Sequence, residues 1–221
     1  MQKFQLILSF LFLCNGALLG QSNRLEIPLE PKSYPLSLIN LEQDGLILYS
    51  LSAQSVSKEE LQLIFYHYDS LLQEKKAFPI KFHKKLKLSK TFAVNGNAYL
   101  FFHTQNQEFF QVSQIDVRQQ KVRNSQFRFY KNFYPYYFQA NGAKAWVGGN
   151  YRGNPLVTEM NLATQKTRLL PTGSDLPIQG IGGLFFDEER EEINYLLQTT
   201  IKNSGVLQLN IFIKFHVNIS L

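Results

Sequence analysis

Two similar stretches, FAVNGNAYLFFHT (Phe92–Thr104) and FQANGAKAWVGGN (Phe138–Asn150), decide how this chain of 221 residues folds. Each stretch places Asn-Gly after a short apolar segment and continues with an apolar run that contains aromatic residues. Asn followed by Gly tolerates the positive φ angles that a two-residue hairpin turn needs at both central positions. A phosphate-binding loop would lead into a helix, whereas each of these turns leads into a strand pattern. Both stretches therefore predict β-hairpins rather than ligand loops.

The similarity continues on both sides of the two stretches and predicts a repeat of about 45 to 51 residues. QIDVRQQKV (Gln114–Val122) matches EMNLATQKT (Glu159–Thr167), so Asp116 and Asn161 occupy equivalent positions, and Asp69 occupies the same position one unit earlier. Four units, each of short strands separated by turn signals, follow residues 1–35, with approximate bounds 36–82, 91–130, 137–171 and 181–221. In the third unit the expected strands are Tyr137–Ala140, Lys144–Gly149, Pro155–Leu162 and Thr167–Pro171.

The composition agrees with an all-β chain. Aromatic residues make up 14% of the sequence, with 19 Phe and 11 Tyr, and such residues favour pleated, half-buried surfaces. No long segment shows the 3.6-residue period of an amphipathic helix.

A four-stranded antiparallel unit that repeats in this way resembles the blade of a β-propeller. The resemblance covers about residues 36 to 215 and lies in spacing and pattern. The Gly-His and Trp-Asp marks of the tryptophan-aspartate type are absent, and the double glycines Gly148-Gly149 and Gly182-Gly183 stand at different places in their units, unlike the kelch type. The chain is thus similar to propeller repeat proteins in general, with a β-sandwich or a long meander as the competing fold.

The fourth unit lacks its outer strand, because NIFIKFHVNISL (Asn210–Leu221) continues without a turn signal. Either the strand expected at Arg24–Leu29 pairs there and closes a four-bladed ring, or the chain forms an open arc or truncated propeller. We expect the open arc, which predicts an exposed sheet edge near Ile211–Leu221.

The first 20 residues have the layout of a secretory signal peptide, with Lys3, an apolar run at Phe4–Leu13 and a cleavage position after Gly20. The run is shorter than the ~20 residues that cross a bilayer, so we expect no transmembrane segment in the mature chain. We expect export to the periplasm or surface of a bacterium, followed by a strand or linker at residues 21–35. Lipid anchoring at Cys14, the only cysteine, is the alternative, although Leu13 is a poor residue before a lipidated cysteine.

The densest signal for binding is the segment Phe127–Phe138, in which eight of twelve residues are aromatic. It joins the second unit to the third, and in a propeller such connections lie on the face where ligands usually bind. The competing interpretation is that rings such as Phe127, Phe129 and Phe138 fill the space between the units. The candidate ligand-binding residues are Tyr130, Tyr134, Tyr136, Tyr137, Arg128 and Lys131.

Other charged groups give weaker signals. The run Lys75–Lys90 carries seven lysines and His83, which suits either an acidic glycan or lipid headgroup or a solvated strand face. The acidic run Asp187–Glu192 lacks the glycine of a calcium loop and predicts a charged hairpin tip. The four histidines lack metal-ligand spacing, and the sequence contains no Gly-x-Ser-x-Gly elbow.

The sequence therefore favours a non-catalytic, exported, propeller-like module that binds a protein or glycan of a bacterial envelope. We expect no metal, no cofactor and no nucleic acid partner. The alternative is a glycan-active or other hydrolytic propeller enzyme, since paired carboxylates from different units could meet in a cleft. Whether the chain is an enzyme stays open at this point.

Overall fold

The computed structural model of the chain describes residue 26 and residues 36–105, 108–170, 180–187, 189–190, 192–202 and 208–218. The expected signal peptide, Cys14 and, apart from Glu26, the strand expected at Arg24–Leu29 lie outside these residues. Within the described part of the chain, no helix is long and apolar enough to cross a membrane.

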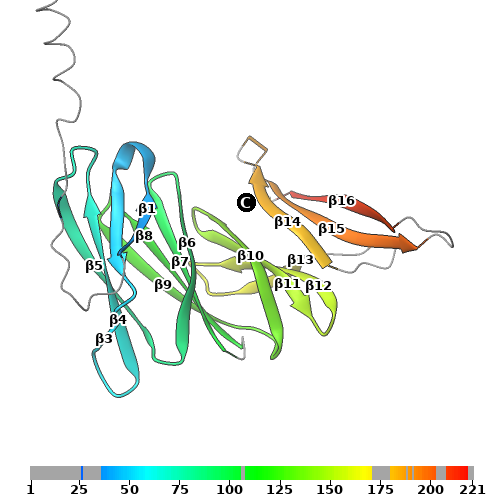
Figure 1. Ribbon diagram of the computed structural model, residues 1–221, viewed down its shortest axis with the longest axis horizontal. Helices are drawn as coiled ribbons and strands as arrows, with labels where there is room; N and C mark the ends of the chain where they lie inside the picture. Colours follow the sequence, from blue (N-terminus) through cyan, green and yellow to red (C-terminus); the bar gives the residue numbers. More distant parts are fainter. Residues whose placement is uncertain are drawn as a thin grey trace, which may run out of the picture.

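Four antiparallel sheets, here named A to D, follow one another along the chain (Figure 1). Sheet A contains β1 (Leu36–Asn40), β2 (Leu46–Ser50), β3 (Gln54–Ser55), β4 (Glu60–Tyr68) and β5 (Glu74–His83), with a 3₁₀ turn at Glu42–Asp44. Sheet B contains β6 (Leu86–Val94), β7 (Asn97–Thr104), β8 (Phe109–Asp116) and β9 (Lys121–Arg128). Sheet C contains β10 (Phe133–Asn141), β11 (Lys144–Tyr151), β12 (Asn154–Asn161) and β13 (Thr167–Leu170). Sheet D contains β14 (Gly180–Asp187), β15 (Glu192–Lys202) and β16 (Gln208–Asn218).

The expectation of an all-β chain built from repeated four-stranded antiparallel sheets is confirmed, and none of the sheets closes on itself. Sheet A differs by having a fifth, two-residue strand. The long strand β4 pairs with β2 only over Phe65–Tyr68, and β3 pairs with Leu61 and Gln62 on the side of β4 that β2 leaves free. Sheet D has three strands in the described residues, and β16 lies at its edge.

The two Asn-Gly stretches both form hairpins, but with different registers. Asn95 and Gly96 are the central residues of the β6–β7 turn and have φ angles of 51° and 73°, as expected. In sheet C, Asn141 still pairs with Lys144, so Gly142 (φ 55°) and Ala143 are the central residues. The expectation that Asn141 occupies a central turn position is therefore wrong by one residue. A positive φ at the first central position alone is the arrangement of a type II′ turn.

The repeated acidic or amide residue of the first three units closes a turn. The Oδ1 atom of Asp69 accepts hydrogen bonds from the backbone N–H groups of Leu71 and Gln73, both at 2.9 Å. Asp116 accepts one from Gln119 at 2.8 Å, and Asn161 accepts from two N–H groups in the β12–β13 turn. Short polar side chains favour such turns because they bond to the backbone a few residues ahead. These repeated positions therefore have an architectural role.

The sheets pack face to face, and the central strands β7 and β11 of sheets B and C are buried on both faces. The five residues Ala98–Phe102 of β7 are all fully buried. Leu100 and Phe102 belong to the core that sheet B shares with sheet A, whereas Tyr99 and Phe101 belong to the core that it shares with sheet C. Successive side chains of a strand point to opposite faces, so an unbroken apolar run is what a strand between two sheets requires.

The same arrangement continues at the next interface. In β11, Ala145 and Val147 pack towards sheet B, while Trp146 packs towards sheet D. The hydroxyl group of Tyr99 crosses one interface and donates to the carbonyl oxygen of Gly142 at 3.1 Å. Burial raises the pKa of Tyr99 to about 12, so this donor keeps its proton across the physiological range.

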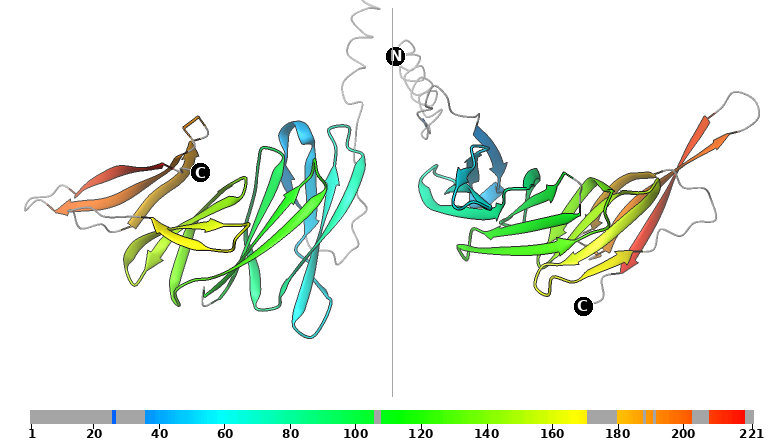
Figure 2. Two further views of the ribbon diagram at one scale, coloured as in Figure 1. Left: turned by 180° about the vertical axis from the view of Figure 1, so that it is seen from behind. Right: turned by 90° about the horizontal axis from the view of Figure 1, so that it is seen from below.

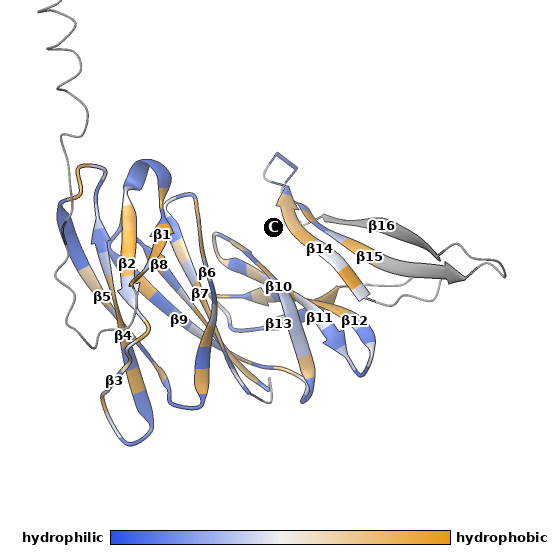
Figure 3. Cartoon of the chain, viewed as in Figure 1, coloured by the Kyte–Doolittle hydropathy of each residue, from blue (hydrophilic) through white to orange (hydrophobic). Residues whose placement is uncertain are grey.

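The four sheets lie in sequence order along the longest axis, with sheets A and D at opposite ends (Figures 1 and 2). The first strand of each sheet contacts the first strand of the next, β1 with β6, β6 with β10 and β10 with β14. Hydrophobic residues occupy much of the strands, while the turns between them are largely hydrophilic (Figure 3).

Replacing Phe101 with Ala should lower the free energy of unfolding by about 3–5 kcal/mol, because it removes a fully buried ring between sheets B and C. The matched control is Phe185→Ala in β14. Its ring is 38% exposed, so we expect a clearly smaller decrease in the free energy of unfolding. Denaturant unfolding of both variants measures the difference. Equal losses would contradict the double burial of β7.

Candidate functional site

Three of the candidate tyrosines lie on the surface of one short segment. Tyr130 and Tyr134 are each 50% exposed, and Tyr136 is 57% exposed. Exposed Tyr rings are frequent anchors of binding surfaces.

Buried neighbours fix the backbone that carries these tyrosines. Phe129 and Phe133 are nearly or fully buried, and their rings stack at a centroid distance of 5.5 Å. The backbone N–H of Phe133 donates to the carbonyl oxygen of Tyr130 at 3.1 Å and closes the turn between β9 and β10. The two buried phenylalanines thus anchor the turn to the core, while Tyr130 and Lys131 remain exposed.

Tyr136 owes its position to a β-bulge. The register between β10 and β11 shifts from Pro135–Gly149 to Tyr137–Gly148, so Tyr136 has no partner residue. A side chain on Gly149 would place its Cβ 2.1 Å from the carbonyl oxygen of Tyr134, so only glycine allows this close approach of β10. The first strands of sheets B and D have similar shifts, at Leu88/Lys90 and Ile181/Gly183.

The surface includes two residues that sequence reasoning missed. The rings of Tyr130 and Tyr151 lie 5.1 Å apart, and the guanidinium carbon of Arg152 lies 5.2 Å from the Tyr151 centroid. Arg152 and Gly153 form a two-residue turn with φ angles of 50° and 82°, so β11 and β12 come closer together than the expected strand ends at Gly149 and Pro155. Phe133 pairs with Tyr151 and Tyr134 pairs with Asn150, so the rings of Tyr134 and Tyr151 point to opposite faces of this end of sheet C. We give the name tyrosine surface to five residues at this end of the sheet: Tyr130, Tyr134, Tyr136, Tyr151 and Arg152.

Two candidate residues lie elsewhere. Tyr137 is only partly exposed and packs against the core between sheets C and D. Arg128 forms an ion pair with Glu108 at 2.7 Å, and its guanidinium carbon lies 5.6 Å from the Phe109 centroid. Arg128 also lines a cavity that none of the four candidate tyrosines lines.

This cavity has a volume of about 670 Å³ and lies between the ends of strands in sheets A and B. Phe82 of β5 borders it on one side, and Phe109, Gln111 and Arg128 of sheet B border it on the other. Glu60 is the single carboxylate among the lining residues that the structure describes.

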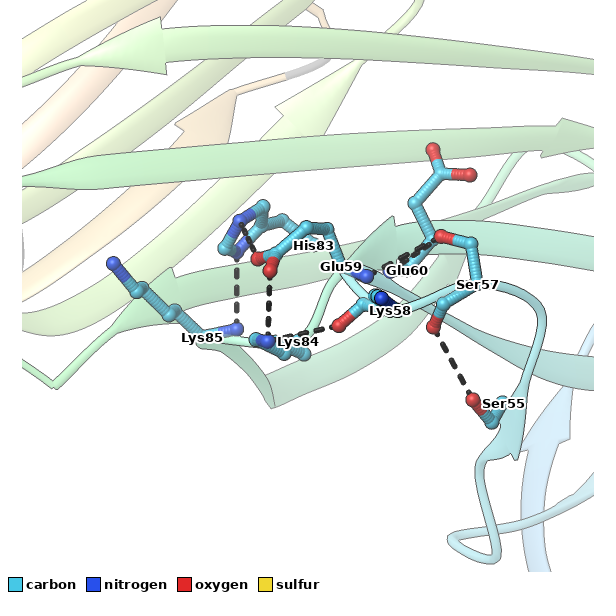
Figure 4. A network of polar contacts seen from close by, with 8 residues as sticks. All are labelled: Ser55, Ser57, Lys58, Glu59, Glu60, His83, Lys84 and Lys85. Atoms are coloured by element: carbon cyan, nitrogen blue, oxygen red, sulfur yellow. Dashed lines mark hydrogen bonds and ion pairs between the residues drawn. The ribbon is translucent and has the colours of Figure 1, made fainter.

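A network of polar contacts fixes the rim of the cavity (Figure 4). The Glu59 carboxylate accepts a hydrogen bond from the Lys84 ammonium at 2.9 Å and lies 3.3 Å from Nε2 of His83. The hydrogen bond from Lys84 lowers the pKa of Glu59 below its ordinary value. Nδ1 of His83 accepts a hydrogen bond from the backbone N–H of Lys85 at 3.1 Å, so the ring proton lies on Nε2, the nitrogen that faces Glu59.

The charge of the basic run Lys75–Lys90 is partly neutralised. Lys75 pairs with Asp69 at 2.7 Å, Lys76 donates to the carbonyl oxygen of Gln120 at 2.9 Å, and Lys84 is bound by Glu59. The run therefore does not present seven free ammonium groups, although His83 and Lys85 reach the cavity lining.

The other sequence candidates have structural roles or form no cluster. Asp187 and Glu192 are opposite each other in the strand pairing of the β14–β15 hairpin. The Asp187 side chain accepts a hydrogen bond from the backbone N–H of Arg190 at 3.2 Å, which fits the expected charged tip. His67 is buried, and its Nε2 lies 2.8 Å from the carbonyl oxygen of Asp44. In the part of the chain that the structure describes, no three His, Cys, Asp or Glu residues are grouped as metal ligands would be.

No protein-family model matches this chain, and no curated protein is significantly similar to it in sequence.

Proposed function

We propose that the chain is a non-catalytic, β-propeller-like binding module, exported to a bacterial envelope, that binds a partner protein through the tyrosine surface. The half-exposed Tyr130, Tyr134 and Tyr136 on a segment anchored by buried phenylalanines carry this proposal. Tyr and Arg are the residues that most often dominate binding energy at interfaces, and Arg152 lies beside Tyr151 in this surface. A rigid platform loses little conformational entropy on binding.

The propeller-like arrangement is supported by three features of the sheets. They follow sequence order, they share cores with their neighbours, and their first strands contact one another. On this proposal the four sheets are the blades of an open arc, and the fourth blade has three described strands. In propellers, connections between blades such as the β9–β10 turn contribute to binding faces.

A glycan is the second candidate for the tyrosine surface, because exposed Tyr rings offer flat faces to sugars and Lys131 is exposed beside them. The hydrolytic alternative requires two facing carboxylates about 5–9.5 Å apart. The described lining of the inter-sheet cavity provides one, Glu60, so no particular observation favours that alternative.

Replacing both Tyr134 and Tyr136 with Ala should weaken partner binding at least about tenfold, because two interface anchors are removed. The matched control is Tyr66→Ala in sheet A, a tyrosine that is 38% exposed and distant in the fold from the tyrosine surface. Envelope extracts are passed over the immobilised variants, and captured proteins are quantified by mass spectrometry.

The expected result is one protein that the unaltered chain and Tyr66→Ala retain and the double variant loses. A glycan array with the same three proteins tests the second candidate. Equal retention by all three proteins, or no ligand in either assay, would contradict the proposal.

Export predicts that the chain, produced in a bacterial host with its first 20 residues, is recovered outside the cytoplasm with Gln21 as its first residue. N-terminal peptide mass spectrometry of the fractionated cells measures this. Recovery of an uncleaved chain in the cytoplasm would refute the export proposal.

A further inference from the structure

The cavity between sheets A and B has the size of a ligand site. Its volume of about 670 Å³ lies within the ~300–1,000 Å³ range of small-ligand pockets. The two sheets share a continuous core on their inner sides, and the cavity opens where β5, β8 and β9 end or begin.

One aromatic ring in the cavity lining is exposed, and the other aromatic rings of the lining are buried. Phe109 is 46% exposed, whereas Phe82, Phe110 and Phe127 are almost completely buried. The Arg128 guanidinium lies over the Phe109 ring and is held there by two hydrogen bonds to Glu108, at 3.0 and 2.7 Å. An aromatic ring flanked by a fixed guanidinium suits a ligand with an apolar face and polar edges.

A buried amide group fixes the wall of the cavity. Gln111 is 1% exposed, and its Nε2 donates to the carbonyl oxygen of Lys81 at 2.9 Å and to the Ser113 hydroxyl at 3.1 Å. This bond joins β8 to β5, so the two sheets hold the cavity walls in place. The side chain of Gln126 adds a second, exposed amide to the lining.

Basic residues outnumber acidic ones in the lining. Among the described lining residues, the cationic side chains are Lys81, Lys85 and Arg128, and the one carboxylate is Glu60. Lys84 and Arg128 are paired with Glu59 and Glu108, whereas the Lys85 ammonium has no partner among the described residues. The charges therefore favour an anionic ligand over a neutral or cationic one.

We propose that this cavity binds an acidic oligosaccharide. The apolar face of one sugar ring stacks on the side of Phe109 that Arg128 leaves open, its hydroxyl groups bond to the exposed amide of Gln126, and its carboxylate lies near Lys85. A flat anionic membrane would meet basic groups on an open strand face, whereas these groups border a cavity. The site is separate from the tyrosine surface and does not depend on the function proposed for it.

Titration calorimetry of the purified chain with trigalacturonate tests the proposal, with neutral maltotriose as the comparison ligand. We expect saturable binding of trigalacturonate with a Kd below about 1 mM and binding of maltotriose at least about tenfold weaker. Raising the ionic strength from about 0.1 to 1 M should weaken the binding of trigalacturonate, because it shortens the Debye length from ~10 to ~3 Å.

Matched variants locate the site. Lys85→Gln and Phe109→Ala should each weaken binding about tenfold, because they remove a charge-assisted contact and the stacking ring. Lys87→Gln makes the same charge change on an exposed residue of β6 outside the cavity lining, and Phe185→Ala removes a partly exposed ring from sheet D. Both controls, and Tyr136→Ala, should bind like the unaltered chain.

Thermal melts confirm that each variant is folded before titration. The proposal is overturned by the absence of saturable binding, by equal affinity for maltotriose, or by equal losses in the Lys85 and Lys87 variants. Binding to anionic lipid vesicles but not to trigalacturonate would also overturn it and assign the basic groups to a membrane surface.

Discussion

The burial of central strands on both faces is the constraint on which the rest of the structure depends. Leu100 and Phe102 need sheet A to cover them, and Tyr99 and Phe101 need sheet C. A single sheet with such a strand would expose one complete row of apolar side chains to water, at a cost of about 1.5–3 kcal/mol for each large residue. Sheets B and C therefore fold stably only in a stack.

The stacking also explains where binding groups gather. The cores lie between the sheet faces, so polar and aromatic side chains that the cores do not use collect at turns, bulges and outer strand ends. The tyrosine surface forms at the β9–β10 turn and the adjacent bulge, where Phe129 and Phe133 face inward and the tyrosines face outward. The cavity lies at the ends of strands in sheets A and B, and the hydrogen bond from Gln111 to Lys81 bridges β8 and β5 at its wall.

Local features of the fold could be predicted because their causes are local. The Asn95-Gly96 turn follows from backbone conformational preference, and the turns at Asp69, Asp116 and Asn161 follow from hydrogen bonds to nearby N–H groups. The unbroken apolar run of β7 has no such local cause, and its burial on both sides is evident only from the packed sheets.

The placement of the candidate site residues depended on longer-range packing. Tyr136 is exposed and Tyr137 is partly buried because a bulge shifts the register of β10, and that bulge depends on Gly149 of the next strand. Arg128 belongs to the cavity because Glu108, twenty residues away, holds it over Phe109. Tyr151 was missed because its contact with Tyr130 depends on the pairing of β10 with β11, which brings together residues far apart in the sequence. An aromatic residue just before an Arg-Gly turn is nevertheless a usable signal.

Hydrogen–deuterium exchange measured strand by strand tests the stacked arrangement most directly. The account predicts that the backbone amides of β7 and β11, which lie in the middle of sheets covered on both faces, exchange most slowly and together with global unfolding. The outer strands β9 and β13 should exchange faster. Equal protection in central and outer strands, or exchange of sheet C independent of sheet B, would contradict the account.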